Sequence, residues 1–226
     1  MHITFIKPKI GRLGGGSPFV DEARMEPLQI GVLAALTPPD VEIAFYDDRM
    51  EEVPFDDPTD LVAITVETFT ARRSYEIASE YRKRGVPVIM GGIHAKLIPE
   101  EVAEHADSVF LGDAEGLWHQ VVEDVRRHQL KPWYHSDVGV PHPNVIPRRD
   151  IYEGKKYLPT SLMQFGRGCR YGCTFCAISK YFDKKHFIRE VKEVVREIES
   201  MPRKVIFLWM IISFPTMKQP RFFFGN

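Results

Sequence analysis

The sequence has 226 residues, a length that accommodates one large domain or two small ones. It is 44% hydrophobic and 27% charged, which excludes an intrinsically disordered chain and is typical of a folded globular protein. Its formal net charge of −1 offers no broad basic field, so we expect no nucleic-acid partner. The sequence contains no apolar run of membrane-spanning length and no signal-peptide pattern, so we expect no membrane span.

Strand and helix patterns alternate through the first part of the chain. Runs of apolar and β-branched residues predict strands at residues 2–7, 41–46, 60–66, 87–90 and 108–111. Apolar residues at helical spacing predict helices at residues 28–36, 71–84, 99–105 and 115–128. This alternation predicts an α/β fold with a parallel sheet covered on both faces, of the flavodoxin or Rossmann type. We assign this domain to residues 1–130.

Several polar residues and glycines follow directly after these predicted strands. Parallel sheets of this kind bind ligands beyond the carboxyl ends of their strands, and glycine there lets the backbone approach a flat ligand. The alternative is that these positions are ordinary strand-to-helix turns, which often use glycine. The candidate ligand contacts are Thr65, Glu67, Gly91, Gly92, His94, Gly112 and Glu115.

Residues 131–160 are rich in proline and lack a regular apolar period, so we predict a linker between two units. Beyond the linker, the pattern predicts a strand at residues 161–165 that leads into a loop rich in glycine and cysteine. An amphipathic helix is predicted at residues 190–200, and another strand at residues 204–208. The second unit, residues 161–208, therefore begins as the first step of a β/α barrel or an open sheet.

The chain has three cysteines, Cys169, Cys173 and Cys176, and all three lie in one short loop. This clustering argues against a secreted disulfide framework and favours a metal or redox site in a reducing cytoplasm. A closed 4Fe-4S cluster takes four thiolates, so a cluster held by these three has one iron free for another molecule. Two alternatives remain open: a Cys3His zinc site that uses His186, and three unrelated buried cysteines.

The spacing C-x3-C-x-aromatic-C, with Phe175 in the aromatic position, resembles the motif of the radical S-adenosylmethionine (SAM) superfamily. The resemblance implies that the three cysteines ligate a 4Fe-4S cluster and that Phe175 contacts SAM. In that superfamily the open iron chelates the methionine part of SAM, and one electron from the cluster cleaves SAM to a 5′-deoxyadenosyl radical. The resemblance also implies a reductant such as flavodoxin or ferredoxin as a partner.

The sequence before the cysteines is similar to the cobalamin-binding subgroup of this superfamily, at residues 25–28, 91–95, 112–116 and 147–150. This similarity implies that cobalamin binds at the strand-end residues and that a radical SAM (β/α) partial barrel follows. The chain has no Asp-x-His-x-x-Gly motif, so the histidine of that motif does not hold cobalamin here. The implied function is cobalamin-dependent methyl transfer or related radical chemistry on an unknown small molecule. The alternative is a cobalamin-binding module with a vestigial cluster loop.

Residues 209–226 differ from the rest of the chain, because they contain no acidic residue and include a phenylalanine triplet. The codons of Trp209 and Met210, read from their third base, encode Asp-Asp, and related proteins place Asp-Asp-Asn at this point. We therefore predict a truncated or frame-shifted protein in which residues 209–226 form an aberrant tail. The alternatives are a genuine divergent tail and a deliberate truncation.

Overall fold

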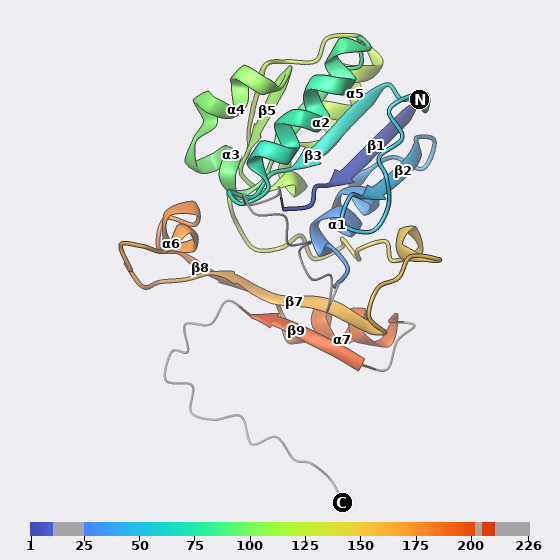
Figure 1. Cartoon of the computed structure of the whole chain (residues 1–226). Helices are drawn as coiled ribbons and strands as arrows, with labels where there is room; N and C mark the ends of the chain where they lie inside the picture. Colours follow the sequence, from blue (N-terminus) through green and yellow to red (C-terminus); the bar gives the residue numbers. More distant parts are fainter. Residues whose placement is uncertain (11–24, 202–204, 211–226) are drawn as a thin grey trace, which may run out of the picture.

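A computed structural model describes residues 1–10, 25–201 and 205–210 of the chain (Figure 1). From residue 211 on, the tail that the sequence singles out lies outside the described residues. In the described part, no helix is both long enough and apolar enough to cross a membrane.

The larger unit is built on a six-stranded sheet in which all neighbouring strands are parallel. The spatial order is β2-β1-β3-β4-β5-β6, so the chain changes direction across the sheet between β1 and β3. This order confirms the predicted α/β fold with a parallel sheet. The strands are β1 (His2–Lys7), β2 (Glu42–Asp47), β3 (Leu61–Thr65), β4 (Val88–Gly91), β5 (Ser108–Leu111) and β6 (Trp133–His135).

Helices cover both faces of this sheet because its strands carry apolar side chains alternately on the two faces. In β1, Ile3 and Phe5 pack on one face and Ile6 packs on the other. The first face is covered by α1 (Leu28–Leu36) and α5 (Trp118–Arg126). The second is covered by α2 (Ala71–Lys83), α3 (Ile93–Leu97) and α4 (Pro99–His105).

The predicted linker is partly built into this unit. Its first part supplies β6, which pairs with β5. A later part forms a short turn, η2 (Asp150–Tyr152), which packs under α1. The Tyr152 side chain is 1% exposed, and its hydroxyl donates a hydrogen bond of 2.8 Å to the carbonyl of Pro27. An added Cβ on Gly31 would lie 2.8 Å from that hydroxyl, so the close approach depends on glycine. The segment therefore fixes the start of α1.

The smaller unit contains a three-stranded sheet with the order β8-β7-β9. Its central strand, β7, is parallel to β9 and antiparallel to β8, a short strand that the sequence pattern did not predict. Helix α7 buries Val194 but leaves Val191 67% exposed, so its apolar face is only partly covered among the described residues. The elements are β7 (Thr160–Gly168), α6 (Ala177–Tyr181), β8 (His186–Ile188), α7 (Val191–Glu199) and β9 (Val205–Met210).

A buried ion-pair cluster holds this smaller unit to the end of the linker. The carboxylate of Glu197 on α7, 1% exposed, accepts hydrogen bonds from Arg149 at 2.7 Å and Arg189 at 2.5 Å. The two guanidiniums also donate to carbonyls of β7, those of Leu162 and Gln164. One carboxylate thus connects the linker, the end of β8 and α7 to the central strand.

Candidate functional site

A cavity of about 470 Å³ lies at the carboxyl ends of β3, β4 and β5. Figure 1 shows β7 running across this end of the six-stranded sheet, and side chains from β7 and α6 form the opposite wall. Helix α1 and Trp118 at the start of α5 close one side with mainly apolar side chains. The volume is within the range of small-molecule sites, and the position at the strand ends is the one that this fold uses for ligands.

The structure brings most of the sequence-predicted contacts to this cavity. Its lining includes Thr65, Glu67, Gly91, Gly92 and Glu115.

Two other predicted contacts do not line the cavity. His94 is only 3% exposed and does not line the cavity. Its Nδ1 lies 3.3 Å from Thr68 Oγ1, and its Nε2 lies 3.2 Å from the hydroxyl of Tyr75 on α2. Gly112, with φ +99°, forms a tight turn in which a Cβ would lie 1.8 Å from the carbonyl oxygen of Ser136. Gly112 therefore shapes the turn after β5 and contributes no lining surface.

The cavity has apolar walls with a few polar groups placed on them. The Thr65 hydroxyl is buried and has no hydrogen-bond partner within the described part of the chain. Glu67 forms an ion pair with the ammonium of Lys7, whose side chain is 8% exposed at the end of β1. An orphaned hydroxyl and an ion-paired carboxylate on the same wall are polar features of the kind that orient a ligand in an otherwise apolar pocket.

Glycine forms the edge of the cavity at the end of β4. Gly92 has φ +112° and ψ −171°, a conformation that is essentially restricted to glycine. A Cβ at Gly92 would lie 2.8 Å from the carbonyl oxygen of Val66, which accepts the backbone N–H of His94. The chain therefore needs glycine here to pass close to the end of β3.

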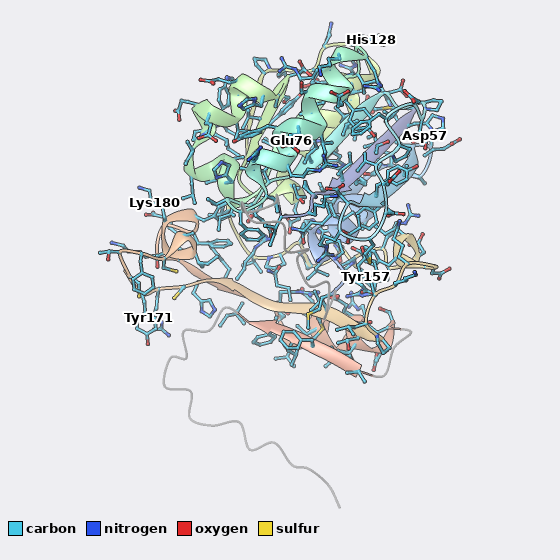
Figure 2. All side chains as sticks on the ribbon, in the orientation of Figure 1. Asp57, Glu76, His128, Tyr157, Tyr171 and Lys180 are labelled. Carbon is cyan, nitrogen blue, oxygen red and sulfur yellow. The ribbon has the colours of Figure 1, made fainter. Side chains whose placement is uncertain are left out.

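The cysteine loop follows β7 directly. Gly168, with φ +83°, turns the chain out of the strand, and a Cβ there would lie 2.2 Å from the Lys185 carbonyl oxygen. Cys173 is exposed, and Cys169 and Cys176 are half-buried; none of the three forms a disulfide. Figure 2 labels Tyr171 and Lys180 at this end of β7 and Tyr157 at the other end.

Two features of the loop are suited to a cluster with an accessible iron. Cys176 precedes the first turn of α6, and the N–H groups of Ser179 and Ile178 lower the pKa of its thiol. A lower pKa favours the thiolate, which is the form that binds iron. Phe175 is 91% exposed, so its ring is free to contact a molecule bound outside the loop.

The three thiols of the loop are the donor type that an iron–sulfur cluster takes. Among the described residues, no group of three His, Cys, Asp or Glu side chains lies close enough to hold a metal ion. A 4Fe-4S cluster differs from a single ion in this respect, because each cysteine ligates a separate iron and the three thiols do not converge on one point. His186 lies opposite Gly168 on β8, and in the same described region no Cys3His zinc site is assembled.

Two side chains that connect the cysteine loop to the cavity are not among the residues predicted from the sequence. Arg167, two residues before Cys169, and Tyr181, at the end of α6, both line the cavity. Both contact the turn after β5 through partners more than 50 residues away in the sequence. A local pattern does not contain such pairings, although the position of Arg167 between Gly166 and Gly168 was visible in the loop motif.

No protein-family model matches the chain, but curated proteins do. The chain is 34% identical over 194 residues to the bacteriochlorophyllide d C-8(2)-methyltransferase of Chlorobaculum tepidum, covering 80% of the chain and 42% of that protein. It is 28% identical over 181 residues to the C-12(1)-methyltransferase of the same organism, covering 77% and 40%. The hopanoid C-2 methylase of Rhodopseudomonas palustris is 24% identical over 192 residues, covering 81% and 36%.

The chain thus spans about two fifths of the length of the two methyltransferases of Chlorobaculum tepidum. Other relatives are named as an anaerobic magnesium-protoporphyrin IX monomethyl ester cyclase and a putative methylthiotransferase. These similarities agree with the cysteine motif that follows the six-stranded parallel sheet. The chain therefore belongs to the radical SAM superfamily.

Proposed function

We propose that this chain is the cofactor-binding part of a radical SAM methyltransferase that adds a methyl group to a carbon atom. The observation that carries the proposal is the shared wall, because β7 both lines the cavity and leads into the cysteine loop. A molecule in the cavity is thereby placed next to the loop. The names of the relatives support methyl transfer, since three of them specify a carbon position that receives a methyl group.

Three groups are proposed to bind here. Cys169, Cys173 and Cys176 hold a 4Fe-4S cluster, Phe175 contacts SAM, and the cavity holds part of a cobalamin. When bound, the cluster and the cobalamin supply the one-electron and methyl-carrying chemistry that no side chain provides. A reductant such as flavodoxin or ferredoxin is the proposed electron donor, and its access is supported by the exposure of the cysteine loop.

The residues of the chain have separate roles in this proposal. The glycine edge at Gly91 and Gly92 lets a flat macrocycle approach the backbone, and the apolar walls exclude water from it. The Thr65 hydroxyl is the group that gains a hydrogen bond when a ligand enters. Glu67, in its ion pair with Lys7, orients polar substituents of the ligand from the cavity wall.

Anaerobic reconstitution with iron and sulfide tests the cluster. The wild-type chain is expected to take up iron and sulfide in the ratio of a 4Fe-4S cluster and to turn brown. Cys173→Ala is expected to lose this uptake while its neighbour Thr174→Ala, also exposed, retains it. One equivalent of zinc with no iron in the wild-type chain would contradict the proposal and favour a zinc domain.

Titration with hydroxocobalamin tests the cavity. Thr65→Val is expected to weaken binding about three- to tenfold, the value of one hydrogen bond, without loss of stability. Ser108→Ala is the matched control, because its hydroxyl on β5 is also buried without a partner among the described residues but does not line the cavity. Equal affinities of the wild-type chain and both variants would remove the cavity from the proposal.

A further inference from the structure

Arg167 makes a three-way contact across the boundary between the two units. Its Nε donates a hydrogen bond of 2.6 Å to the carbonyl of Gly139, and its Nη1 donates one of 2.9 Å to Glu115. Its Nη2 lies 3.2 Å from a carboxylate oxygen of Asp113. The side chains of Arg167, Asp113 and Glu115 are 9%, 10% and 12% exposed, so this ion-pair group is largely shielded from water.

A second anchor reaches the same turn from the other side of the cysteine loop. The hydroxyl of Tyr181, at the end of α6, donates a hydrogen bond of 3.0 Å to the carbonyl of Gly112. The same hydroxyl lies 3.4 Å from Asp113 Oδ1. The loop with the three cysteines is therefore held at both ends, by Arg167 before it and Tyr181 after it, to one turn that follows β5.

A β-bulge in β7 explains why Arg167 faces this turn. Leu162 and Gln164 line the cavity, and strict alternation would place the next inward side chain at position 166. Between Gln164 and Gly166, however, β7 advances two residues while β9 advances one, from Trp209 to Met210. The extra residue shifts the alternation, so Arg167 takes the inward position. Bulges commonly re-aim a side chain in this way next to functional sites.

The turn that receives both anchors is also part of the cavity wall, because Ala114 and Glu115 line the cavity. We propose that Arg167 is a positioning residue that sets the place of the cysteine loop relative to the cavity, with Tyr181 as its second point of attachment. A rigid attachment keeps the distance between two cofactors constant, which electron and group transfer both require. The inference rests on the proposed function for the cluster and the cavity ligand, and it adds the residue that aligns them.

Hydrogen exchange on the cofactor-free chain tests the attachment without any cluster. The probes are the backbone N–H groups of Phe182 and Lys184, which are hydrogen-bonded around α6, and that of Gly139, which donates to Asp113. Arg167→Gln is expected to speed exchange at these probes about tenfold or more while amides in α2 keep their wild-type rates. Tyr181→Phe, which removes one hydroxyl, is expected to give a smaller change of the same pattern. Arg170→Gln, at an exposed position in the loop, is the matched control.

The reduction potential of the reconstituted cluster separates positioning from charge. Arg167→Lys keeps the positive charge but lacks the planar fork that reaches three partners, so it is expected to shift the potential and to speed exchange at the probes. Arg170→Lys is expected to change neither. The inference would be overturned if Arg167→Gln left exchange at the probes unchanged or increased exchange in α2 equally. It would also be overturned if Arg167→Lys kept the wild-type exchange rates and reduction potential. If no variant and no wild-type chain assembles a cluster, the proposed function fails, and the exchange rates still decide whether Arg167 holds the loop.

Discussion

Substituting Gly92 by alanine tests whether the cavity edge depends on a conformation that only glycine adopts. At φ +112° and ψ −171°, a residue with a Cβ is strained by about 1–3 kcal/mol. The new Cβ would also lie 2.8 Å from the Val66 carbonyl oxygen, which must move and weaken its hydrogen bond from the His94 N–H, at a further cost of about 1 kcal/mol. We expect Gly92→Ala to lower the free energy of unfolding by roughly 2–4 kcal/mol.

The matched control is Gly85→Ala. Gly85 also has a positive φ, +75°, but an added Cβ there meets no atom within 4 Å. Its expected loss is about 1 kcal/mol, because only the left-handed conformation is penalised. Urea unfolding followed by circular dichroism measures both losses, provided that the slope with urea is unchanged. Equal losses for the two variants would show that the contact with Val66 carries no free energy and would refute the reasoning.

Two further substitutions test the contacts that join the units. Glu197→Gln leaves two buried guanidiniums without their shared carboxylate, so we expect the free energy of unfolding in urea to fall by about 3–5 kcal/mol. The control is Glu199→Gln at an exposed position, for which we expect a decrease of less than about 0.5 kcal/mol. Tyr157→Phe removes a 2.6 Å hydrogen bond to the fully buried carboxylate of Asp47, and we expect a loss of about 1.5–3 kcal/mol. Tyr171→Phe, at a 53% exposed position, is its control, and a loss as large as that of Tyr157→Phe would contradict the assignment.

The parallel sheet could be predicted from the sequence because its signals are local. Each strand from β1 to β5 is a short apolar run, and each is followed by a helical pattern or a turn, so the order of elements fixes the fold class. The rule that ligands bind beyond the strand ends then identified Thr65, Glu67 and Gly91 as cavity residues. The short strands β6 and β8 were missed because three residues carry too little periodicity to be distinguished from a loop.

His94 shows the limit of the strand-end rule. Its backbone is where the rule places it, with the N–H bonded to the carbonyl of Val66 at the end of β3. The direction of its side chain depends on helices that contact it, because Tyr75 on α2 and Glu101 on α4 form the polar surroundings of the imidazole. A polar residue that follows a strand is therefore a ligand contact only where the neighbouring helices offer its side chain no better hydrogen-bond partner than the ligand.

The bulge in β7 is another feature that the sequence does not predict, and it sets the direction of a side chain at the site. Neither the extra residue nor its effect follows from the strand pattern of residues 161–165, because a bulge is defined only relative to a partner strand. Yet this one residue decides whether the positive charge before the cysteines points into the cavity wall or away from it. With the bulge, Arg167 joins Leu162 and Gln164 on the cavity side and meets two carboxylates that would otherwise be buried without a cation. The strand therefore both lines the ligand cavity and positions the cysteine loop, and the bulge combines the two roles in one strand.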